Sequence, residues 1–549
     1  MDPGLRALPK TPPVSKTVLY AVLMAAALFL ILAVVLLPYP GLQNDECLFT
    51  QPYFGPTAED MKIHVFRRDV TLMLMSYLGT VKTLVFQPIL KVWAPSVWSI
   101  RFPGLITGAA TIWMFGLLLY RLAGPFAAIA GPFLLALDPS YILTTVFDWG
   151  PVAIQHFCLV GGVLALNAFY RSGSQWMLAA GFGLLGLGMW DKALFSWMLS
   201  GLVVASCLFL LKEIWRRLTL LNVAIAVGAF LLGAAPLLIY NVRTNLETFR
   251  GNTKFVPNEI WPKTIQVRRT LDGSGLFGYL THEEWDDSRR QPVNAVERFS
   301  TGVRHFAGYR REGWLGYALL LTLLCLPFWI TRWKIMTFAS VVMVVAWLMM
   351  ASTSGAGGAP HHVVLLWPVP QLLIAVGLAT AVANRRIVWR WAAGAIVVLV
   401  CLQNILVTNQ YLYSFQLVGA GSSWTDAIFP LKDALVRLHP EHVNLMDWGA
   451  EFNILALTRG KMDIRWGAEA GDREVPNAND LRLLAYFLDH TADSVWVEHR
   501  EPIEVTPGSA KRFAKRALDR GYGKQELEVI RDRNGREMFV IYRFVKVSP

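Results

Sequence analysis

Residues 41–56, GLQNDECLFTQPYFGP, directly follow the first long apolar run of the chain and carry two adjacent carboxylates, Asp45 and Glu46. The preceding run, residues 17–38, is long enough to cross a bilayer, for which a helix needs about 20 apolar residues. A charge next to a membrane costs free energy unless it is paired or solvated, so this pair is a candidate functional site. The alternative interpretation is that both are ordinary solvated residues of an external loop.

The composition supports a membrane location for most of the chain. Of its 549 residues, 54% are hydrophobic and 16% are charged, against about 25% charged in soluble domains. The net charge of +12 lies largely in short loops beside apolar segments, where it sets orientation and meets anionic lipid, so we predict no nucleic-acid partner. Four of the five cysteines fall inside apolar runs, which argues against a disulfide framework. The sequence predicts an α-helical polytopic protein of the inner (plasma) membrane.

Apolar segments of spanning length recur along the chain, and short basic turns separate many of them. Because cytoplasmic loops are enriched in Lys and Arg, these turns predict a cytoplasmic N-terminus. The expected spans, eleven in all, are residues 17–38, 102–120, 124–143, 151–170, 176–190, 193–211, 219–240, 314–331, 336–351, 363–383 and 388–408.

Two long external regions interrupt the membrane module, which we place at residues 1–408. The first, residues 39–100, mixes apolar residues with lysines over 67–95, and we predict helices lying along the interface there. A tilted extra span is the alternative, and Lys82 disfavours it. The second is a polar loop at residues 241–312.

Residues 409–549 change abruptly to a polar composition, and we predict an extracytoplasmic α/β domain. HVNLMDW (442–448) and DSVWVEH (493–499) have strand patterns, and KRFAKRALDRGY (511–522) has a helical one. Residues 527–544 form a predicted hairpin that turns at Asn534-Gly535, a strong hairpin signal.

Polar residues recur at the external ends of the expected spans, on the same side as Asp45. Asp148 could instead cap a helix, Lys192 could reach the interface as an anchor, and the histidines could form an interfacial turn. Adjacent histidines lack the i,i+4 spacing of a helical zinc site. The residues in question are Asp148 in TTVFDWGP, Asp191 and Lys192 in GMWDKALF, Asn241 and Arg243 after the seventh span, and His361 and His362 in SGAGGAPHHVVLLWP.

The Asp45–Glu46 pair after the first span resembles the signature loop of the GT-C glycosyltransferases, of the protein O-mannosyltransferase and aminoarabinose-transferase superfamily. VWSIRFPGLITG, with Arg101, is similar to the Arg-containing entry of that family into its second span, and GLGMWDKALF is similar to its Gly-rich stretch ending in Lys. TVKTLVFQPIL departs from the family pattern, because it holds Lys82 and Pro88 without a Pro-Pro pair.

The resemblance implies a bacterial GT-C fold enzyme that transfers a hexosyl or pentosyl group, with inversion, from a polyprenyl phosphate to an extracytoplasmic lipid, glycan or protein. Asp45 would be the general base and Glu46 its support. Lys82, Arg101 and Lys192 would bind the donor phosphate. Asp148, His361 and His362 would hold substrate or a divalent metal ion. The alternatives are another lipid-linked envelope enzyme, such as a ligase or polymerase, a polyprenyl-lipid transporter, and a non-catalytic scaffold.

Overall fold

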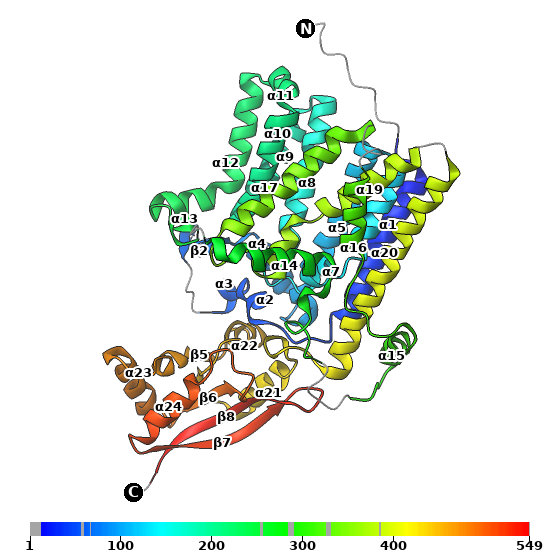
Figure 1. The fold of residues 1–549 in the computed structure, drawn as a ribbon. Coiled ribbons are helices and arrows are strands. Elements are labelled where there is room, and N and C mark those ends of the chain that lie inside the picture. The colour runs from blue at the N-terminus through cyan, green and yellow to red at the C-terminus, as the bar shows by residue number, and fades with distance from the viewer. Residues whose placement is uncertain are drawn as a thin grey trace.

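The computed structural model describes residues 13–55, 60–65, 67–252, 256–283, 290–325, 331–383 and 386–547. A bundle of long helices forms one layer, and an α/β domain lies against one end of it (Figure 1). The predicted division into a helical membrane module and a C-terminal α/β domain therefore agrees with the observed architecture.

Long apolar helices form the bundle, and a continuous hydrophobic core runs between them. Each expected span corresponds to a helix or a broken pair of helices, although residues 326–330 of the span expected at 314–331 lie outside the described residues. The bundle elements are α1 (Lys16–Leu36), α5 (Val97–Ala123), α6 (Pro125–Ala136), α7 (Pro139–Val146), α8 (Val152–Ser172), α9 (Gln175–Asp191), η1 (Ala193–Phe195), α10 (Ser196–Phe209), α11 (Leu211–Arg217), α12 (Leu220–Arg243), α16 (Leu315–Leu324), α17 (Trp333–Ser352), α18 (Pro360–Val363), η5 (Val364–Leu366), α19 (Val369–Ala383) and α20 (Ile387–Tyr413).

Within the described residues, 7 helices are long and apolar enough to cross a membrane, or up to 9 if each of two bent pairs is one span. The count is lower than the predicted eleven because some apolar runs do not form one straight helix. The run at 124–143 bends by 60° between α6 and α7, where Asp138 caps α7 through a 2.9 Å bond from Tyr141 N–H to its Oδ1. α16 is an apolar helix of only 10 residues.

The first external region contains a small sheet where we predicted interfacial helices. β1 (Met61–Val65), β2 (Arg68–Met75) and β3 (Leu78–Gly79) pair antiparallel in that order, and α4 (Val81–Val92) follows them. Thr71 and Met73 are buried two residues apart, as the two-residue period of a strand requires. The prediction of interfacial helices over residues 67–95 was therefore wrong for 67–79, and the helix within that range is α4.

The second external region is more structured than the polar loop we predicted. It holds α13 (Glu247–Asn252), η2 (Pro257–Glu259), α14 (Ile260–Leu271), η3 (Ser274–Leu276) and α15 (Ala295–Ala307). Lys263 of α14 is only 3% exposed, and its Nζ donates to Ala351 O at 3.3 Å, so α14 covers the C-terminal end of α17. This region is therefore a covering layer of the bundle.

The C-terminal domain is built on a five-stranded sheet of order β5-β4-β6-β8-β7. The strands β4, β5 and β6 are parallel and the β7–β8 hairpin is antiparallel, as the Asn534-Gly535 signal predicted. Its elements are α21 (Ile428–Leu438), β4 (His442–Leu445), α22 (Glu451–Thr458), β5 (Asp463–Trp466), η8 (Ala468–Gly471), α23 (Ala478–Asp489), β6 (Ser494–His499), α24 (Ser509–Leu518), β7 (Tyr522–Arg531) and β8 (Glu537–Lys546).

The expected domain boundary at residue 409 falls inside α20, which runs on into a π-helical turn, η6 (Ser414–Val418). This extension is buried although it carries polar side chains, among them Gln410 and Gln416. The tip of the β7–β8 hairpin then returns to the bundle, where the Arg536 side chain donates to Ala420 O at 2.7 Å. The domain is thus held to the bundle by this hairpin as well as by the chain connection itself.

Candidate active site

A short helix, α2 (Asn44–Leu48), positions the two adjacent carboxylates. Gln43 caps its N-terminus by accepting from Asp45 N–H at 2.5 Å and Glu46 N–H at 3.2 Å, and Gln43 N–H donates back to Glu46 Oε2 at 2.9 Å. This reciprocal capping box fixes the direction of Glu46. Because the two carboxylates are consecutive on a helical turn, they point in different directions.

Glu46 points inward and forms a buried ion pair with Arg101 on α5. Arg101 Nε lies 2.8 Å from Glu46 Oε1, and Arg101 Nη2 lies 2.8 Å from Oε2. The remaining guanidinium donors bind the carbonyl oxygens of Leu37, Pro40 and Gly41 at 2.5, 3.2 and 2.6 Å. Arg101 is 1% exposed and all five of its N–H groups have partners, so no donor of its guanidinium is left for a phosphate in this arrangement.

Asp45 is the member of the pair that stays partly exposed. Burial raises the pKa of its carboxyl above the usual value, while the positive charges of Lys192 and Lys82 act in the opposite direction. A carboxylate with a raised pKa near two cations has the environment of a general base. The geometry therefore separates a structural acid, Glu46, from a chemically available one, Asp45.

Lys82, at the start of α4, pairs with the predicted second carboxylate. Its Nζ lies 3.1 Å from Asp148 Oδ2 and also donates to Asp148 O, and the Phe49 ring lies 4.6 Å from the same atom. Asp148 Oδ1 accepts from Ala153 N–H at 3.1 Å, so Asp148 caps α8 as well. Asp148 therefore caps a helix, as the alternative interpretation predicted, and also pairs with Lys82, while its binding of substrate or metal stays a prediction.

Lys192 lies between α9 and η1, and the small sheet holds its backbone. Leu78 of β3 forms an antiparallel bridge with Lys192, and Ala193 N–H donates to Tyr77 O at 2.9 Å. The ammonium donates to Gly150 O at 3.1 Å and is 3% exposed. Burial lowers the pKa of Lys192 to about 8, against the opposing effect of the carboxylates of Asp191 and Asp148.

His361, like Lys192, lies close to Gly150, and His362 follows His361 in the sequence. Trp149 Nε1 donates to His361 Nδ1 at 3.1 Å, and a side chain added at Gly150 would lie 2.8 Å from the His361 ring. Gly357 N–H donates to His362 Nδ1 at 3.1 Å, so this imidazole nitrogen is occupied. Among the residues that the structure describes, no group of three His, Cys, Asp or Glu side chains is placed to hold a metal ion.

The C-terminal domain contacts the loop that carries Asp45. Phe452 N–H of α22 donates to Asn44 Oδ1 at 2.9 Å, and the Asn453 amide donates to Leu42 O at 3.0 Å. Gly41 N–H donates to Trp424 O at 2.7 Å. The candidate base is therefore held by both parts of the chain.

Comparison with known proteins identifies the fold. No protein-family model and no curated protein matches the sequence. A solved structure of ArnT from Cupriavidus metallidurans bound to undecaprenyl phosphate superimposes with a TM-score of 0.54 at 14% identity, over 95% of this chain and 97% of that chain. The oligosaccharyltransferase of Archaeoglobus fulgidus, tethered with an acceptor peptide, superimposes with a TM-score of 0.50 at 11% identity, over 97% of this chain and 74% of that chain.

The chain has the GT-C fold. The resemblance inferred from the Asp-Glu loop is confirmed at the level of fold, since identities this low show no more than that. Within this GT-C fold, Lys82 pairs with Asp148, and Lys192 and His361 both lie against Gly150. The charges of Lys82 and Lys192 act on Asp45, and Glu46 and Arg101 form a separate buried pair.

Sequence reasoning missed several residues that shape the site. Gln155 Nε2 lies 2.9 Å from Asp191 Oδ2 and so holds a fully buried carboxylate beside Lys192. Asp138 accepts from Trp367 Nε1 at 2.9 Å and from Gln371 Nε2 at 3.0 Å, deep in the bundle. The signal was present, because Asp138 is a carboxylate inside an apolar run, and such residues are paired or functional.

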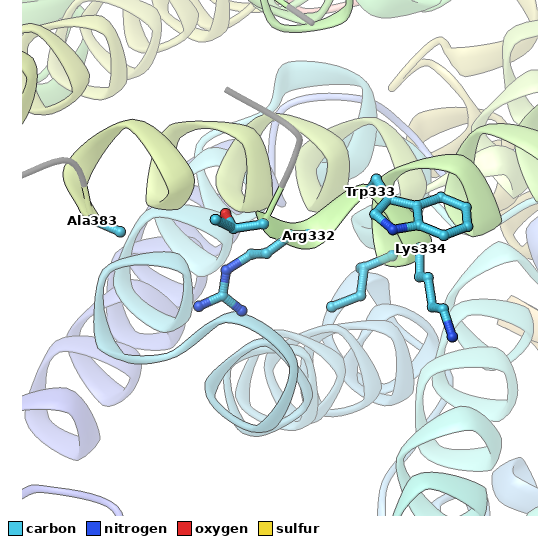
Figure 2. A pocket seen from close by; sticks show the side chains of 6 residues that line it. Arg332, Trp333, Lys334 and Ala383 are labelled. Carbon is cyan, nitrogen blue, oxygen red and sulfur yellow. The ribbon is translucent and has the colours of Figure 1, made fainter. Parts of the chain in front are cut away.

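A cavity of about 560 Å³ lies at the other end of the bundle, lined by Thr331, Arg332, Trp333, Lys334, Ile335 and Ala383. Figure 2 shows Arg332 and Lys334 beside it. These residues lie at or next to the N-terminus of α17, whereas Lys263 and the histidines lie near its C-terminus. The cavity is thus separated from the Asp45 group by the length of a helix of 20 residues, about 30 Å.

Proposed function

We propose that this protein is an integral membrane glycosyltransferase that moves a sugar, with inversion, from a polyprenyl-phosphate donor to an extracytoplasmic acceptor. The observation that carries the proposal is the placement of one partly exposed carboxylate, Asp45, within reach of the charges of Lys192 and Lys82. The structure of ArnT bound to undecaprenyl phosphate supports the donor class.

Asp45 would act as the general base. It accepts the proton of an acceptor hydroxyl or amine while that oxygen or nitrogen bonds to the anomeric carbon. The bond from the anomeric carbon to the phosphate oxygen breaks, and its electron pair leaves with the polyprenyl phosphate. A single displacement inverts the anomeric centre, so no enzyme nucleophile is needed.

Lys192 is the cation best placed to stabilise the leaving phosphate. Among the described residues, the hydrogen-bond acceptor of its Nζ is Gly150 O, and an ammonium group has three donors. Lys82 already donates to the carbonyl and carboxylate of Asp148. We therefore assign phosphate binding to Lys192 first, with Lys82 contributing its charge and Asp148 holding Lys82 in place.

The test is turnover of a polyprenyl-phosphate sugar in proteoliposomes, measured as release of polyprenyl phosphate. General-base catalysis contributes about 10²–10⁴-fold, so Asp45→Asn should lose that much rate while retaining donor binding. Asp69→Asn, at an exposed carboxylate of the same external region, is the matched control. Unchanged turnover in Asp45→Asn would remove Asp45 from the chemistry, and turnover restricted to lipid-diphosphate oligosaccharides would favour the ligase alternative.

A further inference from the structure

Helix α15, in the second external region, carries an apolar stripe with no protein over it in the described chain. Val296, Phe299 and Phe306 are 40%, 73% and 96% exposed. Together with Val303 they are spaced three, four and three residues apart, which places them on one face of a helix. Exposed phenylalanines grouped on one face mark an interaction surface.

A second face of α15 is held against the rest of the protein by buried polar contacts. Glu297 is 2% exposed and binds Arg290 Nη2 at 2.8 Å and Val293 N–H at 2.7 Å. Arg290 Nη2 also donates to Gln416 O in η6 at 2.9 Å. The helix is therefore anchored to the junction between α20 and the C-terminal domain, and the direction of its apolar stripe is set by these bonds.

A third face of α15 is polar. Arg298 and His305 are exposed. At about 100° per residue, the buried, apolar and polar faces lie roughly 120° apart around the helix axis. Such a division suits a helix with protein at its side, water on one face and an apolar phase on the other.

The position of α15 identifies that apolar phase. The Asn409 amide of α20 donates to Ser300 O of α15 at 3.1 Å, just beyond the span expected at residues 388–408. Nearer the N-terminus of α20, Val398, Leu399 and Leu402 are about half exposed, as lipid-facing residues are. In Figure 1, α15 lies beside the end of α20 that adjoins the C-terminal domain. The apolar stripe thus lies where the lipid-facing surface of the bundle ends.

We propose that α15 lies in the outer interface of the membrane and inserts Phe299 and Phe306 among the lipids. The occupant of the stripe is the outer leaflet of the bilayer, and Arg298 on the polar face stays with water and lipid headgroups. The helix thereby ties the junction with the C-terminal domain to the membrane surface. This inference rests on the membrane location of the bundle and is independent of the proposed transferase activity.

Site-directed spin labelling in proteoliposomes tests the proposal. The background carries Cys207→Ser and Cys325→Ser, because Cys47, Cys158 and Cys401 are buried and the other two are not. Single labels are placed at Phe299→Cys and Phe306→Cys, with Arg298→Cys and His305→Cys as adjacent controls on the polar face. Collision rates are measured with oxygen, which concentrates in lipid, and with a water-soluble nickel chelate.

The labels at 299 and 306 should collide with oxygen several-fold more than with the chelate, and those at 298 and 305 should show the reverse ratio. Chelate access at all four positions would place α15 in water and overturn the proposal. Protection of 299 and 306 from both reagents would overturn it as well, because a protein surface would then cover the stripe. All four positions are exposed, so the labels leave the fold intact.

Discussion

Arg101 and Lys192 are both buried cations at the end of the bundle that adjoins the α/β domain, yet their hydrogen-bond environments differ. Arg101 has a carboxylate and three carbonyl groups around its guanidinium, so it serves the fold. Lys192 has one carbonyl acceptor among the described residues. Their positions in the sequence could not distinguish them, because Arg101 directly precedes an expected span and Lys192 lies between two expected spans. The distinction depends on which groups meet them in three dimensions.

Glu46→Gln tests the structural role of the buried pair. Removing one partner leaves the Arg101 charge uncompensated, which should destabilise the protein by about 3–5 kcal/mol. The exposed pair of Arg500 with Glu526 supplies the control, since Glu526→Gln should change stability by less than about 1 kcal/mol. The measurement is denaturant unfolding in detergent micelles. Equal losses from the two variants would contradict the account.

The pH dependence of transfer follows from Asp45 and Lys192. Activity needs Asp45 unprotonated, so the rate should rise with pH through its raised pKa. It also needs Lys192 protonated, so the rate should fall as the pH passes about 8. Lys192→Arg keeps its charge at alkaline pH and should remove the fall, at some loss of maximal rate. Lys91→Arg, at an exposed lysine, should leave the profile unchanged. If the rate still falls at alkaline pH in Lys192→Arg, a group other than Lys192 causes that fall.

At the scale of elements, α2 depends on the close approach of two parts of the chain. A side chain at Gly41 would lie 2.0 Å from Thr425 O, so Gly41→Ala must push the Asp45 loop away from the C-terminal domain. A misplacement of about 1 Å can cost about 10²-fold in rate, and we expect a loss of that order in initial transfer rate. Gly394→Ala meets nothing within 4 Å and should be neutral. Normal turnover in Gly41→Ala would show that this contact does not position the base.

Apolar periodicity predicted the long helices well and the external elements poorly. α1 and α20 follow directly from their composition, and the hairpin follows from Asn534-Gly535. The β1–β3 sheet was missed because its apolar residues resemble those of an interfacial helix, and strand pairing is decided by contacts distant in sequence. The capping box of Gln43 with Glu46 has a recognisable sequence pattern, in which the capping residue precedes Glu by three positions. That pattern predicts that the Glu46 side chain points back to the helix N-terminus and not in the direction of Asp45.

At the scale of the whole molecule, the arrangement predicts one orientation. The basic ends of the spans lie away from the α/β domain, so we expect the N-terminus in the cytoplasm and residues 419–547 outside. Alkaline phosphatase fused to the C-terminus should be active, because it needs an extracytoplasmic location, and a C-terminal fluorescent protein that folds only in the cytoplasm should be dark. The reverse pattern would invert the topology and place Asp45 in the cytoplasm.

The sequence could predict that several distant loops lie on the same side of the membrane as Asp45, but not how they are arranged there. Asp148, Lys192 and His361 all lie at external ends of expected spans, and the structure connects them through Lys82 and Gly150. Their order around Asp45 was not predictable, because it depends on how the helices pack. The contribution of α22, which contacts Asn44 from more than 400 residues away, had no sequence signal.

The most direct test is a structure of Asp45→Asn in nanodiscs with an intact polyprenyl-phosphate sugar. The account predicts that the phosphate lies within hydrogen-bond distance of Lys192 Nζ, with the anomeric carbon facing residue 45 and the polyprenyl chain running along the bundle. A lipid phosphate bound at Arg332 and Lys334, at the opposite end of α17, with none near Lys192, would contradict it.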